Sequence, residues 1–497
     1  MTILSTADER GLHGLSLDTQ VRQAFFAMPP AVLADLDQRM TAGAFARNLV
    51  YLRDGQTEAI RILMRPTAVL PDQLAYLHYA SLTLINALKR LPDLYIQDFA
   101  VRSVVPLTPP EEKWLWDCWG PSQREANPVF GRLDAVIDFT SPMWKDSLHY
   151  MEPNLSGVGG IYIIPAAEQL LAEVVMPTLR EYAPRLDLEP GQDLRQMFMQ
   201  ELDDHLDAIG RTGRTLCFIE PKYSADGPDE QAVLAAYFRE RYGLSVLHAD
   251  PSELEMRDGE VCYQGQVIDI GYRDYEVRDL IYLEAEEGLD IRPLRTLFKT
   301  NRIVSSAAGD FDHKSCWEIL TDPQFTTKYF TADERAVFRR HVLWTRGLHD
   351  RRTTLPNGES GDLLEFARHE QETLVIKPNR SYGGEGILIG PSTPVAEWEA
   401  ALQTAAAAGP EDEQWVVQQL TRIPVSEFPV IDPDGGVCIE PFYTVMGLAP
   451  TKYGLGILGR ASQKQVVNVA QRGGLCSVLI GKPGARLMGP GEPAKRG

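Results

Sequence analysis

The chain has 497 residues and a formal net charge of −20, from 49 basic and 69 acidic side chains. This excess of negative charge repels DNA, RNA and anionic membrane surfaces, so a general nucleic-acid role is disfavoured. Hydrophobic residues make up 44% and charged residues 24%, as in ordinary globular proteins, and a chain of this length is expected to form two or three packed lobes.

The six cysteines form no CxxC pair, and no His/Cys spacing suits zinc. The N-terminal residues MTILSTADERG lack the basic-then-apolar pattern of a signal peptide, and no apolar run is long enough to span a bilayer. We therefore expect a cytoplasmic protein that does not insert into membranes. The composition of the last residues, MGPGEPAKRG, predicts a disordered tail.

The first part of the chain is predicted to be helical. Between residues 17 and 90, apolar residues recur at helical spacing, and Pro29 and Pro71 stand where helices would begin. This pattern indicates a helical packing layer rather than a site.

A predicted β-hairpin follows, with GRLDAVIDF and LHYMEPN as its strands. Residues two apart on a strand face the same side, so Arg132 projects with Asp134, and Glu152 with Asn154. If the strands pair, three oxygen ligands suited to Mg²⁺ and one guanidinium converge. The alternative to a metal site is a surface Arg–Asp pair beside an unrelated hairpin. His149, next to the proposed metal strand, is interpreted as a structural residue.

After the turn LSGVGG and a helical stretch, residues from about 214 to 298 read as strand, helix, strand and hairpin, which predicts a small α/β layer. FKTNRIVSSAAGDFDHKSCWEIL then reads as a loop and a helix, with Lys314 at the helix start. A lysine at the start of a helix is usually only solvated. Lys314 becomes a candidate site residue if its helix borders an anion-binding cleft.

The most specific local pattern is LVIKPNRSYGGEGILIG, in which a strand ends in Lys377, a loop carries three glycines, and a second strand begins at Ile387. Glycines let backbone N–H groups close over an anion, and a lysine at the strand end can reach phosphate oxygens. The pattern matches neither the Walker A loop nor the dinucleotide fingerprint, and a plain tight turn is the alternative.

The last third is predicted to be β-rich, with antiparallel strands in WVVQQL, CIEPFYTVMG, YGLGILGRAS and KQVVNVAQRGG. Arg460, Ser462, Asn468 and the turn Arg472-Gly473-Gly474 could line an anionic cleft, although an ordinary solvated hairpin explains each residue singly. No GxSxG or HExxH motif occurs, so serine-hydrolase and zinc-protease chemistry are not indicated.

Taken together, these motifs resemble the ATP-grasp superfamily. The features that carry the resemblance are Lys377, the glycines through Gly386, the strand WVVQQL and the stretch VVNVAQRGG. The resemblance implies two α+β lobes that clamp ATP between antiparallel sheets. Lys314 and Lys377 match the family's two lysines in order, and the segment from Gln418 to Leu420 would hold the adenine.

The order of the motifs resembles the circularly permuted branch of that superfamily, which includes the synthetase domain of glutathionylspermidine synthase. There, an RxD and an ExN near the front supply the catalytic arginine and the Mg²⁺ ligands, and here RLD and EPN precede both lysines. The resemblance covers roughly residues 130 to 480. The turn LSGVGG departs from the family's pattern, which puts glutathione as a substrate in doubt, and no Cys/His amidase domain precedes the motifs.

The implied fold class is α+β: a permuted ATP-grasp fold with a helical N-terminal region and a small α/β domain. The expected segments are the helical region 1–128, the metal-binding and catalytic segment 129–212, the small α/β domain 213–298, the glycine-loop lobe 299–400, the β-rich second lobe 401–485 and the tail 486–497.

The implied activity is an ATP-dependent carboxylate–amine ligase that forms an amide through an acyl phosphate on an amino acid or small peptide. ATP and Mg²⁺ are the expected cofactors and small carboxylates and amines the partners, without nucleic acid or membrane; a homodimer is left open. Within enzymes the rival is a phosphotransferase on the same fold, and outside them a non-catalytic nucleotide-binding protein.

The expected site residues fall into four groups. They are Arg132 and Arg460 for catalysis; Asp134, Glu152 and Asn154 for the metal; Lys314, Lys377, Tyr382, Gly383, Gly384, Gly386, Gln418, Gln419 and Leu420 for ATP; and Ser156, Gly157, Arg472 and Gly473 for the substrate.

Overall fold

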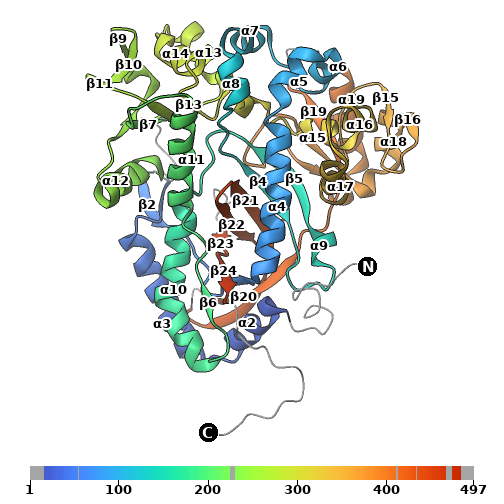
Figure 1. Ribbon diagram of the computed structural model, residues 1–497. Coiled ribbons are helices and arrows are strands. Elements are labelled where there is room, and N and C mark those ends of the chain that lie inside the picture. The colour runs from blue at the N-terminus through green and yellow to red at the C-terminus, as the bar shows by residue number, and fades with distance from the viewer. Residues whose placement is uncertain are drawn as a thin grey trace.

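The computed structural model describes residues 16–482, apart from 54, 224–229, 385, 410–411, 433 and 466–472. It is a mixed α+β structure in which long helices flank a central sheet, with one lobe on either side of their upper ends (Figure 1). Arg472, Asn468 and the predicted tail 486–497 lie outside the described residues.

The central sheet joins the front of the chain to its end. Its strand order is β23-β22-β21-β4-β5, with β20 also paired to β21, and every pairing is antiparallel. The strands are β4 (Arg132–Val136), β5 (His149–Asn154), β20 (Val425–Ile431), β21 (Val437–Thr451), β22 (Gly454–Ser462) and β23 (Gly474–Leu475).

The hairpin expected from the sequence is confirmed. Asp134 stands opposite Glu152 and Arg132 opposite Asn154, with a register shift after Asp134. On its other side β4 pairs with β21, where Asp134 is opposite Gly447. β4 is therefore held between β5 and β21, and the other strands of this sheet come more than 270 residues later in the chain.

Helices of the N-terminal region and of residues 163–208 cover this sheet (Figure 1). They pack through apolar residues that form one large core with the strands. The helices that cover the sheet are α2 (Leu17–Phe26), α3 (Pro30–Ala46), α4 (Pro71–Leu88), α10 (Ile163–Tyr182) and α11 (Leu194–Ala208). The other helices of this part of the chain are α5 (Leu91–Gln97), α6 (Phe99–Val104), α7 (Pro109–Cys118), α8 (Pro121–Glu125) and α9 (Trp144–Ser147).

The N-terminal region also contains strands that the helical reading did not include. β1 (Val50–Arg53) and β2 (Gln56–Ala59) form a short hairpin, while β3 (Thr67–Val69) pairs in parallel with β24 (Val478–Gly481), which also pairs with β6 (Leu188–Glu189). β3 has only three residues and depends on a distant partner, so its sequence carries no local strand pattern.

The small α/β unit is a four-stranded parallel sheet in the order β13-β12-β7-β8. Residues Leu216–Ile219 are buried without alternation, as expected for a strand covered on both faces. Its elements are β7 (Leu216–Ile219), α12 (Glu230–Tyr242), β8 (Val246–Ala249), β9 (Glu255–Arg257), β10 (Glu260–Tyr263), β11 (Gln266–Val267), β12 (Ile270–Arg273), α13 (Val277–Glu286), α14 (Arg292–Lys299) and β13 (Ile303–Val304).

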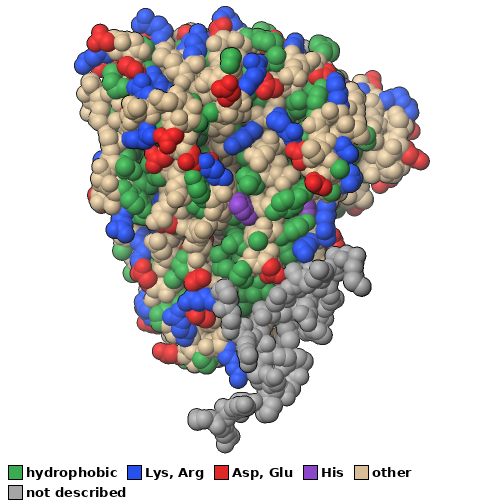
Figure 2. Space-filling view, viewed as in Figure 1, with side chains coloured by type: hydrophobic (Ala, Val, Ile, Leu, Met, Phe, Trp, Pro, Cys, Tyr) green, Lys and Arg blue, Asp and Glu red, His purple; other side chains and the backbone are tan. Residues whose placement is uncertain are grey.

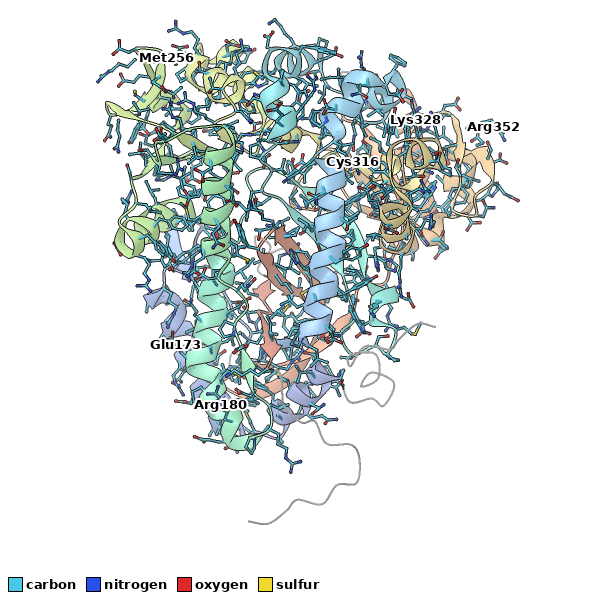
Figure 3. The ribbon with its side chains drawn as sticks, viewed as in Figure 1. Glu173, Arg180, Met256, Cys316, Lys328 and Arg352 are labelled. Carbon is cyan, nitrogen blue, oxygen red and sulfur yellow. The ribbon has the colours of Figure 1, made fainter. Side chains whose placement is uncertain are left out.

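The other lobe, which carries Lys328 and Arg352 in Figure 3, has an antiparallel sheet in the order β14-β19-β17-β18 and its own apolar core around Trp398. Its elements are α15 (Cys316–Thr321), α16 (Pro323–Tyr329), α17 (Ala332–His341), β14 (Thr345–Gly347), β15 (Arg352–Thr354), β16 (Ser360–Asp362), α18 (Leu363–His369), β17 (Leu374–Pro378), β18 (Leu388–Ile389), α19 (Val395–Ala407) and β19 (Trp415–Gln419).

On the face shown in Figure 2, Lys and Arg side chains are interspersed with Asp and Glu. Within the described ranges, the helices are all too short or too polar to cross a membrane.

A buried ion pair fastens the first helix to the rest of the core. Asp18 on α2 accepts hydrogen bonds from Arg65 Nη1 at 3.0 Å and from the Ala68 N–H at 3.0 Å. Arg65 is fully buried, lies over the Phe428 ring and donates to the Glu427 carbonyl on β20. Removing the carboxylate would leave the guanidinium buried without its counter-charge.

We expect Asp18→Ala to lower the free energy of unfolding by about 3–5 kcal/mol, measured by urea denaturation. The control is Asp35→Ala on α3, because the pair of Asp35 with Arg39 is exposed. This substitution should change the free energy of unfolding by less than about 0.5 kcal/mol. Equal effects of the two substitutions would contradict the assigned role of the buried pair.

Candidate functional site

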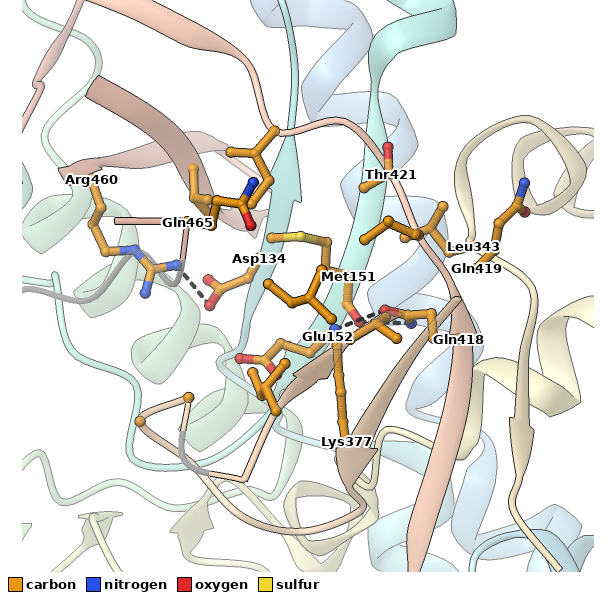
Figure 4. Close-up of a pocket in the computed structure, with 18 residues that line it drawn as sticks. Asp134, Met151, Glu152, Leu343, Lys377, Gln418, Gln419, Thr421, Arg460 and Gln465 are labelled. Carbon is orange, nitrogen blue, oxygen red and sulfur yellow. Dashed lines mark hydrogen bonds and ion pairs between the residues drawn. The ribbon is translucent and has the colours of Figure 1, made fainter. Parts of the chain in front are cut away.

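A cavity lies where the acidic hairpin of the central sheet faces the glycine hairpin of the other lobe (Figure 4). The two hairpins are separated by more than 200 residues in the chain. The lining residues are Asp134, Met151, Glu152, Leu343, Val375, Lys377, Gly383, Gly384, Ile387, Ile389, Gln418, Gln419, Leu420, Thr421, Ile423, Val445, Arg460 and Gln465.

The acidic side of the cavity is neutralised by neighbouring cations. Asp134 pairs with Arg460 at 2.7 Å and with Arg132 at 3.2 Å. Burial by itself raises the pKa of Asp134, but the two guanidiniums outweigh it and hold that pKa below its ordinary value. Glu152, which is partly exposed, lies 3.4 Å from the Lys314 ammonium. Asp134 is thus kept ionised, and both carboxylates are held in place by neighbouring cations.

Of the two lysines, Lys377 lines the cavity, whereas Lys314 lies next to the lining residue Glu152. Lys314, directly before α15, donates from Nζ to the Ser381 carbonyl at 2.7 Å. Lys377, on β17, donates to Gln418 Oε1 at 2.8 Å. Burial lowers the pKa of Lys377 to about 8, although Glu152 opposes that shift.

Asn379 was not among the residues singled out from the sequence, yet it joins the two lysine segments. Its carbonyl accepts the Lys314 N–H at 3.0 Å, and its Oδ1 accepts the Ser315 N–H at 2.8 Å. Because Asn379 follows β17 directly, this contact fixes the start of α15 against the strand that carries Lys377. In the sequence, Asn379 is only an asparagine that follows a predicted strand, and such a residue is too common to indicate a role in a site.

The glycine loop has the backbone that its composition predicts. Gly383, Gly384 and Gly386 have φ of 77°, 79° and 69°, which is the region that side chains disfavour. A Cβ on Gly386 would also lie 2.9 Å from Pro378 Cγ. Tyr382 donates to Asp312 Oδ1 at 3.3 Å, and Gly383 and Gly384 line the cavity. Substitution at these glycines would strain the loop.

One end of the cavity is apolar and formed by both sheets. Gln418 is buried there, whereas Gln419, its neighbour on β19, is exposed. The Gln419 and Leu420 N–H groups donate to Trp344 and Thr373 carbonyls at 2.9 and 2.8 Å. The N–H groups of Gln419 and Leu420 are therefore already hydrogen-bonded within the protein. A ring bound here would take its hydrogen bonds from other groups, and Leu420 would contribute an apolar wall.

A second cavity of about 460 Å³ adjoins the first at the end of the acidic hairpin. Arg132 enters it and donates to the Gly159 carbonyl at 2.8 Å, which ties this arginine to the LSGVGG turn. Asn154 donates to the Arg132 carbonyl at 3.3 Å. The lining residues are Arg132, Asn154, Ser156, Gly157, Val158, Gly159, Asp274, Tyr275, Glu276, Arg278, Asp279 and Tyr382.

This second cavity carries charges of both signs. Gly157 has a φ of 59°, and a Cβ there would lie 1.9 Å from Asp274 Oδ1, so the turn packs directly on that carboxyl group. Burial, together with the charges of Glu220 and Glu230, raises the pKa of Asp274 to about 7. Asp274, Glu276, Arg278 and Asp279 were not assigned a role from the sequence.

Most of the described residues selected from the sequence line one of the two cavities, whereas Lys314, Gly386 and Gly473 line neither. Gly473 stands directly before β23, whose Leu475 pairs with Arg460, and it lines neither cavity. Ser156 and Gly157 line the second cavity rather than the first. Their binding roles remain predictions.

Comparison with solved structures finds a glutathione synthetase-like effector (GSS30) from Globodera pallida in its apo form, with a TM-score of 0.60 and 11% sequence identity. The match covers 91% of this chain and 97% of that one. No family model matches the sequence, and neither does any curated protein. At this identity the likeness concerns the fold alone, so the chain has a glutathione synthetase-like α+β fold.

The base of the glycine loop is anchored by the N-terminal region. Arg380 makes a bidentate pair with Glu111 on α7, at 3.1 and 2.7 Å, and also reaches Glu276. Burial alone raises the pKa of Glu111, but Arg380 holds it below its ordinary value, so this contact persists above pH 4.5 and is lost as pH falls through the lowered pKa.

We expect Glu111→Gln to speed hydrogen exchange of loop amides near Tyr382, because Arg380 loses its charged partner. Hydrogen-exchange mass spectrometry measures this. Glu112→Gln, on the same helix and more exposed, is the control and should leave the loop's protection unchanged. Unchanged protection in both variants would show that Glu111 does not anchor the loop.

Proposed function

We propose that the protein is an ATP-dependent carboxylate–amine ligase of the ATP-grasp type, with its segments in circularly permuted order. The observation that carries this proposal is the cavity in which Asp134 and Glu152 face Lys377 and the glycine loop. An acidic edge and a cationic edge across one cavity are what a metal-bound triphosphate requires. The glutathione synthetase-like fold is consistent with it.

The cavity suits a nucleotide along its length. Its apolar end, with Val375, Leu420 and Ile423 among its walls, would take a purine ring. The phosphates would then lie towards Lys314, Lys377 and the backbone N–H groups of the glycine loop. A lysine acts there as a point charge, and the loop adds donors without a Cβ in the way.

Asp134, Glu152 and Asn154 fit Mg²⁺ by their chemistry, since this ion prefers carboxylate and amide oxygens and shares nucleotide phosphates. The Asn154 amide nitrogen donates to Arg132, so its oxygen is the atom available as a ligand. Among the described residues, no three His, Cys, Asp or Glu side chains are grouped so that they could hold a metal ion. The proposed set differs because it has only two carboxylates and adds an amide oxygen. When bound, the ion would neutralise phosphate charge.

The reaction would use both cavities. The substrate carboxylate, held in the second cavity near Ser156 and Gly157, attacks the γ-phosphorus, and ADP leaves. An amine then attacks the acyl phosphate carbon; phosphate leaves, the nitrogen loses a proton, and an amide remains. Arg132 enters the second cavity while its partner Asp134 lines the first, so it can steady charge on the transferred phosphoryl group and on the tetrahedral adduct.

Water must be kept from the acyl phosphate, and the glycine loop is placed to exclude it. Tyr382 lines the second cavity while Gly383 and Gly384 line the first, so one segment borders both. Closure of this loop over bound nucleotide would shut the two together. Arg460, paired with Asp134 from β22, is proposed as the second catalytic arginine.

Two other functions remain to be separated from this one. A phosphotransferase on the same fold would release a stable phosphoester, and a nucleotide-binding protein without catalysis would release no ADP. Both carboxylates and Lys377 line the cavity, and Lys314 lies beside Glu152; this set of charges favours catalysis.

The deciding experiment follows ADP release with Mg·ATP and pairwise panels of amino acids, short peptides and amines. We expect release that depends on both a carboxylate and an amine, and Glu152→Ala to reduce it at least about a thousandfold with an unchanged unfolding midpoint. Glu173→Ala, on the exposed face of α10 (Figure 3), should behave as wild type. Release independent of any amine would refute the ligase reaction.

The protonation of Lys377 should appear in nucleotide binding. Its pKa of about 8 in the free protein means that the ammonium, faced by Glu152, Asp134 and Lys314, is lost as pH rises through 8. We expect the Kd for Mg·ATP, measured by calorimetry, to be flat below pH 7 and to rise between pH 8 and 9. Lys377→Met should bind more weakly at every pH and lack this rise; a pH dependence that survives in the variant would assign it to another group.

A further inference from the structure

Gln418 was expected to contact ATP, but its side chain is only 1% exposed and its polar atoms are engaged within the protein. Oε1 accepts from Lys377 Nζ at 2.8 Å, and Nε2 donates to the Met151 carbonyl at 3.0 Å and to Thr345 Oγ1 at 2.8 Å. Both amide hydrogens are therefore used, and none is left for a nucleotide.

The orientation of this amide follows from its partners. An ammonium can only donate, so the oxygen of Gln418 must face Lys377, and a carbonyl can only accept, so the nitrogen must face Met151. Thr345 donates its own hydrogen to the Leu343 carbonyl at 3.0 Å and so accepts from Gln418. A flipped amide would break all three bonds.

These bonds connect the two walls of the cavity. Gln418 and Thr345 belong to the paired strands β19 and β14, and Lys377 to the neighbouring strand β17, whereas Met151 belongs to β5 of the central sheet. Met151 directly precedes Glu152, and its carbonyl also accepts from Trp317 Nε1 at 3.1 Å. The buried amide thus sets the position of the lysine relative to the strand that carries the acidic group.

We propose that Gln418 is a positioning residue: its amide clamps the Lys377 ammonium to β5 and fixes the separation of the cationic and acidic edges of the cavity. The expected effect on nucleotide binding rests on the proposed function, because Lys377 is assigned there to the phosphates. Gln418 acts through Lys377, not on the nucleotide itself.

The first test is a double-mutant cycle on Mg·ATP binding, measured by calorimetry. Gln418→Met, which keeps an unbranched side chain but no amide, should weaken binding about tenfold, as loss of a hydrogen bond to a charged group predicts. In a Lys377→Met background the same substitution should weaken it less than about twofold, because the residue it acts through is gone. Equal penalties in the two backgrounds would overturn the proposal.

The control is Gln123→Met, which removes a buried amide bonded to the Phe298 and Lys299 carbonyls, away from either cavity. It should leave Mg·ATP affinity unchanged with or without Lys377. A loss of affinity as large as that of Gln418→Met would show that any buried glutamine has this effect, which would also overturn the proposal.

The second test needs no nucleotide. Acetic anhydride labelling of Lys377, quantified by mass spectrometry, should be several times faster in Gln418→Met than in wild type, because the amine is no longer held. It should be slower in Gln418→Glu, because a carboxylate favours the unreactive ammonium. Identical rates in the three proteins would overturn the clamp. Failure of the wild type to bind Mg·ATP, with labelling rates that still differ, would refute the proposed function and leave the clamp standing.

Discussion

The site depends on balancing buried charge where two sheets meet. Asp134 lies between Arg132 and Arg460, and Glu152 lies beside Lys314. The charge of the buried Asp134 would be costly alone, and it is tolerated because both guanidiniums lie within about 3.5 Å; Glu152 is partly exposed and pairs at 3.4 Å. The pairings hold β4, β5, β22 and the segment before α15 against one another, and the cavity lies beside them.

Most of the remaining architecture supports that junction. β4 is fixed between β5 and β21, so the acidic residues cannot shift along the sheet without breaking its register. Asn379 fixes the start of α15, and Glu111 in the N-terminal region anchors Arg380 before the glycine loop. The helical region is therefore part of the site's support, although it lines the cavities little.

One loop borders both cavities, and the Arg132–Asp134 ion pair links them, because Arg132 lines the second cavity and Asp134 the first. Tyr382 and Arg132 border the second cavity, while Gly383 and Asp134 border the first. A group activated in one cavity can be attacked from the other without leaving the protein.

The sequence by itself determined the local elements: the alternating strands with Arg132, Asp134, Glu152 and Asn154, and the strand and glycine loop after Lys377. Such patterns arise from periodicity and backbone freedom, which act over a few residues. Tertiary structure alone decided the pairing of β3 with β24, the second cavity's carboxylates, and the inward, saturated amide of Gln418. Those features depend on contacts between residues that lie tens to hundreds of positions apart in the chain, and such contacts leave no mark in local spacing.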